Sequence, residues 1–249
     1  MNPAHRQSSY RIRFDWGPTG AQAIAGGAEL AVVVDVLSFT TTLCVAVERG
    51  ITVLPYRWKD ERAAGYAAER DAALATERLE GLSPAAMARV DGVDRLVLPS
   101  PNGSSISFGL AEVGARVVGA SLLNRYAVAG WLHPAISDGA SVAVVAAGER
   151  WPDGSLRPAI EDLWGAGAVL AALADLGAAG LSPEARVAEQ AFRAVELDVA
   201  AALRGCASGR ELTDAGFAED VEVAAGLDVS DVVPVLVDGE FARATTPPR

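Results

Sequence analysis

The sequence predicts an α/β fold in which helices cover a mostly parallel sheet. Short runs rich in Val, Ile and Leu, each bounded by turn residues, occupy 10–14, 30–36, 51–56, 95–100, 115–120, 141–147 and 232–239. These runs are continuously apolar rather than alternating, which is typical of strands buried on both faces. Alanine-rich segments with helical spacing lie between most of them, at 41–49, 60–75, 104–113, 122–132 and 161–177. Strands and helices in alternation indicate βαβ units.

The C-terminal third departs from this alternation. Residues 160–227 have an almost wholly helical pattern, and Ser182-Pro183 has the form of a helix start. The chain then returns to an apparent strand at 232–239. Because no Pro/Gly/Ser-rich linker and no repeat divides the sequence, we expect one domain over 1–249 with a helical subregion at 160–227.

Composition excludes several classes of protein. The net charge of −11 argues against nucleic acid or an anionic membrane as the main partner. No apolar stretch approaches ~18 residues and no signal-peptide pattern is present, so we expect no membrane span and a cytoplasmic location. The two cysteines, Cys44 and Cys206, are far apart and belong to no Cys/His cluster, which argues against a zinc site or a disulfide scaffold. We interpret both as structural.

The first polar loop follows the second apolar run. Asp35 lies near the end of this strand, and Ser38, Thr40 and Thr41 occupy the turn and the first helical positions. N–H groups and hydroxyls at a helix start make an anion site, and the Asp35 carboxylate can hold a metal ion or act as a nucleophile. The alternative is a purely structural loop in which Thr40 caps the helix and Asp35 accepts local amide N–H groups.

The second polar loop is Ser-Pro-Asn-Gly-Ser-Ser at 100–105, between a predicted strand and a predicted helix. Pro-Asn-Gly is a strong turn signal, and Gly103 lets the backbone approach a ligand closely. With Asn102 and Ser104 it forms a second candidate anion site, although an ordinary tight turn with a serine cap would have the same sequence.

The third polar loop mixes acidic and basic residues after the strand at 141–147. Glu149 and Arg150 come first, Arg157 follows, and Glu161 and Asp162 begin a long apolar helix. Carboxylates suit a hard cation such as Mg²⁺, and arginines suit an oxyanion. The alternative is a solvated loop of salt bridges.

Ligands bind beyond the carboxyl ends of strands in doubly wound sheets, so we expect the three loops to converge at one edge. Asn124, in a fourth loop after the run 115–120, is a further candidate ligand contact. Such a site suits a metal-assisted phosphoester hydrolase, in which a cation and hydrogen-bond donors together neutralise a phosphate. A dinucleotide-binding enzyme is disfavoured because no G-x-G-x-x-G follows the early strands.

Four segments carry a family resemblance. "VVVDVLSFTTTLCVAVERG", "PSPNGSSIS", "GERWPDGSLRPAIEDLWGAGAVL" and "SGRELTDAGFAEDVEVAAGLDVSDVVPVLVDG" resemble, in order, the 2-phosphosulfolactate phosphatase family over roughly residues 30–239. The resemblance implies a three-layer α/β/α fold with a mostly parallel or mixed sheet. It implies a Mg²⁺-dependent phosphatase that converts (2R)-2-phospho-3-sulfolactate to 3-sulfolactate and phosphate, a step of coenzyme M biosynthesis.

With this resemblance, each candidate residue receives a predicted role. Asp35, Glu149 and Asp162 are the predicted catalytic residues and Mg²⁺ ligands, with Glu161 as a fourth ligand or a partner of the ligands. The predicted substrate contacts are Ser38, Thr40, Thr41, Asn102, Gly103, Ser104, Asn124, Arg150 and Arg157. The attacking group is either water, which we prefer, or Asp35 through an aspartyl-phosphate.

The chain departs from the family pattern at one point. The first block of the family usually reads Asp-Val-Leu-Arg-Ala-Thr-Thr-Thr, and here Ser38 and Phe39 replace the arginine and alanine. Losing one charge-assisted hydrogen bond weakens anion binding by ~1.5–3 kcal/mol. Two alternatives therefore stay open: a phosphatase acting on another small phosphorylated acid, and a non-catalytic anion-binding protein. A homodimer is the expected assembly, since symmetric dimers are the commonest oligomers.

Overall fold

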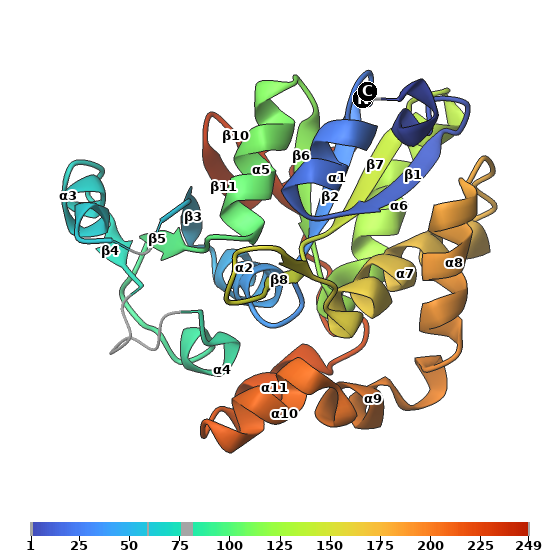
Figure 1. Ribbon diagram of the computed structural model, residues 1–249. Helices are drawn as coiled ribbons and strands as arrows, with labels where there is room; N and C mark the ends of the chain where they lie inside the picture. Colours follow the sequence, from blue (N-terminus) through green and yellow to red (C-terminus); the bar gives the residue numbers. More distant parts are fainter. Residues whose placement is uncertain (1, 59, 76–81, 249) are drawn as a thin grey trace.

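The computed structural model describes residues 2–58, 60–75 and 82–248 of the chain, and its centre is a mixed sheet of nine strands (Figure 1). The strand order is β1-β7-β2-β6-β10-β11-β3-β5-β4. The strands of this sheet are β1 Ile12–Trp16, β2 Leu30–Val34, β3 Thr52–Tyr56, β4 Ala73–Leu74, β5 Arg95–Pro99, β6 Arg116–Ala120, β7 Val142–Ala146, β10 Pro234–Val237 and β11 Glu240–Arg243. A separate hairpin pairs β8 Glu149–Arg150 with β9 Leu156–Arg157.

Helices fill most of the connections. The α-helices are α1 Gly17–Ile24, α2 Phe39–Glu48, α3 Arg62–Ala68, α4 Pro84–Met87, α5 Gly103–Glu112, α6 Arg125–Ser137, α7 Ile160–Asp175, α8 Pro183–Arg193, α9 Val199–Gly205, α10 Ala207–Asp214 and α11 Ala218–Ala224. Short 3₁₀ turns lie at Pro3–Arg6, Leu122–Asn124 and Glu196–Asp198. No helix among the described residues is long and apolar enough to cross a membrane.

The sheet consists of two parallel blocks that run in opposite directions. One block is β1-β7-β2-β6 and the other is β3-β5-β4. The β10–β11 hairpin lies between them and pairs antiparallel on both sides, so three antiparallel pairings separate β6 from β3. The sheet is therefore mixed, one of the two arrangements predicted.

The hairpin itself was not predicted, because 232–239 was interpreted as a single strand. Its turn is Asp238-Gly239, with φ of 52° and 85°. Both values fit a type I′ turn, for which Asp-Gly is a preferred sequence. The signal for a second strand was thus present in the sequence.

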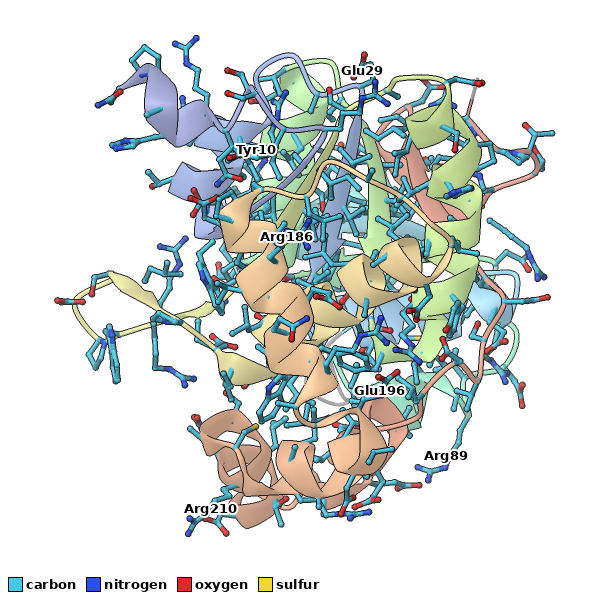
Figure 2. All side chains as sticks on the ribbon, turned by 90° about the vertical axis from the view of Figure 1, so that its right-hand side faces the viewer. Tyr10, Glu29, Arg89, Arg186, Glu196 and Arg210 are labelled. Atoms are coloured by element: carbon cyan, nitrogen blue, oxygen red, sulfur yellow. The ribbon has the colours of Figure 1, made fainter. Side chains whose placement is uncertain are left out.

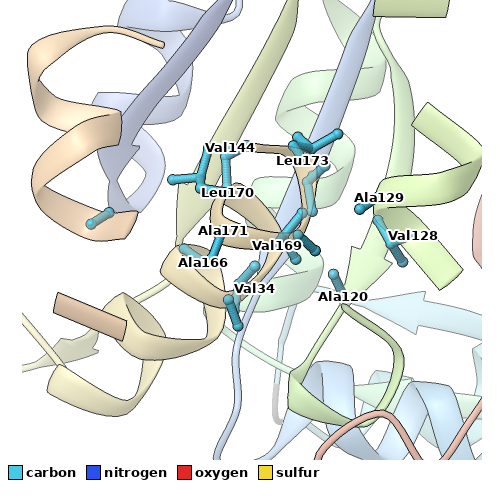
Figure 3. Close-up of a cluster of buried hydrophobic side chains, with 14 of the residues drawn as sticks. Val34, Ala120, Val128, Ala129, Val144, Ala166, Val169, Leu170, Ala171 and Leu173 are labelled. Carbon is cyan, nitrogen blue, oxygen red and sulfur yellow. The ribbon is translucent and has the colours of Figure 1, made fainter. Parts of the chain in front are cut away.

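Helices cover both faces of the sheet, which confirms the three-layer α/β/α prediction. Along β2, Leu30, Val32 and Val34 belong to the core under α6 and α7, whereas Ala31 and Val33 belong to the core under α1, α2 and α5. This alternation follows from the period of two along a strand, and burial of both sets explains the continuous apolar run. Figure 3 shows the first core, where Val34 and Val144 of the strands meet Val169 and Leu170 of α7.

The C-terminal helix α8 packs against α7 and β1 at the right of Figure 1, and α9–α11 extend beyond this layer at the bottom of the figure. They confirm the predicted helical region 160–227. The contact of α8 with α7 is close, because a Cβ built on Gly167 would lie 2.0 Å from the Ala188 carbonyl oxygen. At the far end, Ser83 Oγ donates a 2.6 Å hydrogen bond to Asp220 Oδ1 and ties α4 to α11.

The predicted helices need one correction and one addition. The helix predicted at 60–75 ends at Ala68, because Asp71 adopts a left-handed φ of 49° and the chain then enters β4. Helix α1 is an addition to the predicted elements: Gly17 has a φ of 60° and lets the chain turn directly from β1 into a helix.

Candidate active site

The loops after β2, β5 and β7 meet at one place. Asn102 Nδ2, after β5, donates a 3.2 Å hydrogen bond to Glu149 Oε2, after β7. A Cβ on Gly103 would lie 2.2 Å from Cδ1 of Phe39, after β2. In Figure 1 the starts of α2 and α5 and the β8 strand accordingly lie together. The predicted convergence of the three polar loops therefore occurs.

A common edge of one parallel block does not explain this convergence, because β5 runs opposite to β2 and β7. Neighbouring strands rotate by roughly 20–25°, so the five steps from β2 to β5 accumulate on the order of 100°. Such a rotation turns the carboxyl end of β5 back toward the ends of β2 and β7. The site thus depends on the twist of the whole sheet.

Asp35 lies at the start of α2, almost fully buried at 6% exposure. Its Oδ1 accepts a 3.1 Å hydrogen bond from the Phe39 N–H. Two hydroxyls predicted to receive substrate bind the loop backbone instead: Thr40 Oγ1 donates to the Asp35 carbonyl oxygen (2.8 Å) and Thr41 Oγ1 to that of Val36 (2.7 Å). These bonds hold the loop in shape. The Thr40 N–H also donates to the Asp35 carbonyl oxygen (2.9 Å), so the backbone N–H that this pair offers a ligand is that of Thr41.

Asp162 joins the first and third loops. Its Oδ1 accepts from the Val36 N–H (2.7 Å) and its Oδ2 accepts from the Gly148 N–H (2.8 Å). Each carboxylate oxygen thus binds the backbone just beyond a different strand, β2 or β7. This geometry makes Asp162 a positioning residue, whatever further contact its oxygens make with a ligand.

The β8–β9 hairpin carries two arginines and Glu149. Arg150 Nε donates a 3.2 Å hydrogen bond to Asn102 Oδ1, so Asn102 bridges Glu149 and Arg150. Arg157 lies opposite Glu149 in the hairpin and donates from Nη2 to Ser208 Oγ at 3.3 Å. The tip of the hairpin extends away from the body of the molecule (Figure 2).

Glu161 is 2% exposed at the start of α7. Within the described part of the chain, its carboxylate receives one hydrogen bond, from Cys206 Sγ at 3.6 Å. Burial, followed by the charge of Glu161, raises the pKa of the Cys206 thiol to about 11, so the thiol keeps its proton. This contact goes beyond the structural role expected of Cys206, and no local sequence pattern indicates it.

Asp35, Glu149, Glu161 and Asp162 form a carboxylate cluster whose members repel one another. Burial, then the charges of Glu149 and Glu161, raises the pKa of Asp35 to about 7. The pKa of Asp162 is raised well above its usual value by burial and by Asp35 and Glu161. Burial also raises the pKa of Glu149, although Arg157 opposes this shift. A bound cation would relieve this repulsion.

The donor set of the cluster fits a hard cation, because carboxylate oxygens are the ligands that Mg²⁺ prefers. Among the described residues, Glu149 and Glu161 accept hydrogen bonds from side chains alone, whereas Asp35 interacts with the backbone N–H groups of Phe39 and Gly103. As they lie in this structure, no three His, Cys, Asp or Glu side chains of the described residues are already arranged around a single ion position. Binding an ion therefore requires a shift of these side chains.

The starts of α2 and α5 are suited to anions. Neither Ser38 nor Asn102 makes a side-chain cap, and within the described residues the Thr41 and Ser104 N–H groups have no hydrogen-bond acceptor. Unpaired N–H groups at a helix start attract phosphate or sulfonate. The Ser104 hydroxyl itself is buried and donates to the Leu98 carbonyl oxygen at 3.5 Å.

Asn124 and Arg125 are used by the fold. Asn124 Oδ1 accepts from the Ser121 N–H (2.9 Å), and its Nδ2 donates to the Val232 carbonyl oxygen (2.9 Å). Arg125 is buried in ion pairs with Asp228 and Glu196. The structure shows no contact between either side chain and the carboxylate cluster.

Comparison with known proteins gives the family. The family model described as 2-phosphosulpholactate phosphatase matches residues 20–239. The chain belongs to the 2-phosphosulpholactate phosphatase family. It is accordingly a phosphatase, a hydrolase of phosphoric monoesters. A protein of Deinococcus radiodurans named "Probable 2-phosphosulfolactate phosphatase" is 32% identical over 227 residues, which cover 87% of this chain and 91% of that protein.

Three residues at the phosphatase site were not among the predicted site residues. Phe39 packs its ring over Gly103, while Cys206 and Ser208 bring the start of α10 against Glu161 and Arg157. The block "SGRELTDAG" had contributed to the resemblance without a role at the site. Of the three residues, Ser208 alone lies in this block, so the resemblance was a signal for Ser208 and not for Cys206.

Proposed function

We propose that this phosphatase hydrolyses (2R)-2-phospho-3-sulfolactate to 3-sulfolactate and phosphate in a Mg²⁺-dependent reaction, as in coenzyme M biosynthesis. One observation carries the proposal: two helix starts, each with an N–H group that has no acceptor among the described residues, and two arginines surround a cluster of mutually repelling carboxylates. The helix starts and arginines provide separate places for several anionic groups. The carboxylates provide ligands for the cation that phosphatase chemistry uses.

Phosphate binding is assigned to the helix starts. The Thr41 and Ser104 N–H groups belong to two different helices, and the absence of a side chain at Gly103 lets the Phe39 ring hold the two helix starts together. Ser38 stands where the family pattern has arginine and adds a hydroxyl to this region. These donors neutralise the phosphoryl oxygens through hydrogen bonds rather than through a guanidinium.

Sulfonate and carboxylate binding is assigned to the hairpin. Arg150 donates to Asn102 Oδ1 at 3.2 Å and to the Gly154 carbonyl oxygen at 3.3 Å, and Arg157 donates to Ser208 Oγ at 3.3 Å, which leaves most donors of each guanidinium available. Arginine binds an oxyanion through two parallel hydrogen bonds. Arg150 and Arg157 supply positive charge at the site, in a protein whose net charge is −11.

Mg²⁺ would be held by Asp35, Glu149 and Glu161, with Asp162 fixing the backbone beneath them. When bound, the ion supplies positive charge that polarises the phosphoryl group and offsets the charge of the cluster. We favour water as the attacking group over an aspartyl-phosphate. Asp35 is 6% exposed and one of its oxygens accepts the Phe39 N–H, which restricts in-line attack by this carboxylate.

A substrate panel tests the proposal. Phosphate release is measured with Mg²⁺ from racemic 2-phospho-3-sulfolactate, phospholactate and phosphoglycolate. We expect the fastest release from the sulfonated compound. Release from the unsulfonated acids alone would contradict the substrate and favour another phosphorylated acid, and no release from any would favour a non-catalytic anion-binding role.

A matched pair of variants tests the part of the arginines. Arg157→Gln should lower kcat/KM for the sulfonated compound by about 10–100-fold, since a charge-assisted hydrogen bond contributes ~1.5–3 kcal/mol. The effect on phosphoglycolate should be smaller. Arg70→Gln, which removes a guanidinium stacked on Tyr66 in α3, is the control and should change neither value. Equal losses on both substrates for Arg157→Gln would contradict this assignment.

A further inference from the structure

The junction of α9 and α10 contacts two residues of the phosphatase site. Cys206 Sγ lies 3.6 Å from Glu161 Oε2, and Ser208 Oγ accepts from Arg157 Nη2 at 3.3 Å. In Figure 2 α10, where Arg210 is labelled, accordingly lies beneath the base of the β8–β9 hairpin. Glu211, one turn further, is close enough to Glu149 for its charge to act on that carboxylate.

The local geometry of this junction is closely determined. Cys206 Sγ accepts a 3.3 Å hydrogen bond from the Gly209 N–H and so caps α10. Its single proton is shared between Glu161 Oε2 at 3.6 Å and the nearer acceptor, the Leu203 carbonyl oxygen at 3.1 Å. A Cβ on Gly209 would lie 1.9 Å from this same oxygen, so no side chain fits there. The sequence Cys-Ala-Ser-Gly thus fixes where the thiol and the Ser208 hydroxyl lie.

We propose, resting on the phosphatase function proposed above, that the segment Cys206–Glu211 is a positioning wall of the active site. Cys206 holds the Glu161 carboxylate toward the carboxylate cluster, and Ser208 holds Arg157 toward the second anionic group of the substrate. The C-terminal helices thereby take part in the reaction, although their residues touch neither the reacting phosphorus nor the leaving oxygen.

The Glu161 carboxylate depends on Cys206 for its hydrogen bonding. It is 2% exposed, and among the described residues the thiol is the one group that hydrogen-bonds its carboxylate. Hydrogen-bond donors to a metal ligand orient that ligand, and their loss typically weakens metal binding or activity about 10–100-fold. Loss of the donor should therefore affect the residues that hold the cation rather than the stability of the fold.

Three substitutions separate the thiol's two hydrogen-bonding functions. Cys206→Ser keeps a helix cap and a donor, Cys206→Asp keeps a cap but replaces the donor with a carboxylate, and Cys206→Ala removes both. The serine variant should retain wild-type turnover within about threefold. The alanine and aspartate variants should lose about tenfold or more in kcat and need more Mg²⁺ for half-maximal activity, with KM nearly unchanged.

Ser182→Ala is the matched control, because Ser182 caps α8 through a 3.0 Å hydrogen bond from the Ala185 N–H and makes no contact with the site. It should lower the melting temperature without changing kcat. Ser208→Ala should instead raise KM for 2-phospho-3-sulfolactate with little change in kcat. A second readout independent of turnover is the rise in melting temperature on adding Mg²⁺, which should be smaller in Cys206→Ala than in the wild type.

The outcomes distinguish this inference from the proposed function. If the wild type releases no phosphate from any compound, the proposed function fails, and the Mg²⁺-induced shift still decides whether Cys206 supports the cation site. If the wild type is active and Cys206→Ala matches it in kcat and in that shift, the positioning role is wrong. If the alanine variant does not fold, the comparison of Cys206→Ser with Cys206→Asp decides, and equal activity of these two would overturn the proposal.

Discussion

At the scale of single residues, neighbouring aspartates of one cluster have different tasks. Both carboxylate oxygens of Asp162 accept hydrogen bonds from backbone N–H groups, which fixes the loops after β2 and β7. Asp35 accepts the Phe39 N–H at one oxygen, and its pKa is raised to about 7 by burial and by nearby carboxylates. A buried carboxylate whose charged form is disfavoured by its surroundings is typical of a functional site, because that charge does not stabilise the fold.

Replacing Asp35 should therefore stabilise the protein when no cation is present. Its folded-state pKa lies above the usual value of 3.8, so below about pH 4 both the folded and the unfolded state hold the proton. As the pH rises toward and through 7, ionisation favours the unfolded state and stability is lost. Asp35→Asn removes this loss and should raise the free energy of unfolding at pH 8 in chelator by on the order of 2–4 kcal/mol.

Thermal and urea unfolding between pH 4 and 8, with chelator, measure this effect. The gain of Asp35→Asn over the wild type should disappear near pH 4, and phosphate release should be lost at every pH. Asp153→Asn, in the exposed tip of the same region, is the control and should give no gain, since hydrogen bonds from Ser155 lower the pKa of that carboxyl. A stability difference that does not change with pH would contradict the interpretation.

At the scale of elements, the site is assembled by close packing between loop and helix. Gly103 begins α5 directly against the Phe39 ring at the start of α2, and that ring also packs edge-on against Phe241 of β11. These contacts join the two helix starts that are proposed to hold phosphate. The separation of the two starts is therefore set by one aromatic ring and one missing side chain.

Gly103→Ala should consequently disturb the site. The added methyl group would lie 2.2 Å from Phe39 Cδ1, so the ring must move, and overpacking of this kind costs about 1–3 kcal/mol. Gly109→Ala in the same helix is the matched control, because nothing lies within 4 Å of its Cβ. It should stabilise the protein by about 0.5–1 kcal/mol. Urea unfolding compares the two, and equal effects would show that the Phe39 contact is unimportant.

Much of the arrangement of strands and loops could be predicted from the sequence. Each of the seven apolar runs overlaps a strand, and the three polar loops meet as expected, because buried strands and strand-to-helix turns leave local signals. The directions of individual side chains left no such signal. Thr40 and Thr41 turn their hydroxyls to the backbone, Asn124 binds Val232, and Cys206 reaches Glu161 from 45 positions away. These contacts depend on tertiary packing that no local pattern encodes.

At the scale of the whole molecule, the three polar loops after β2, β5 and β7 meet for a different reason than expected. The prediction assumed a single edge of a parallel sheet, yet β5 runs opposite to β2 and β7 across the β10–β11 hairpin. The twist of nine strands and the C-terminal helices together complete the site. Strand order over this distance in the sequence is not encoded in any single segment, so it could not be predicted from local patterns.

The central claim is that three loops form one cation-dependent phosphatase site. The most direct measurement is phosphate release from 2-phospho-3-sulfolactate by chelator-treated enzyme as Mg²⁺ is added back, with Glu149→Gln beside the wild type. The account predicts no release in chelator, full recovery with Mg²⁺, and about a tenfold or greater increase in the Mg²⁺ that Glu149→Gln needs for half-maximal release. Release that continues undiminished in excess chelator would contradict the account.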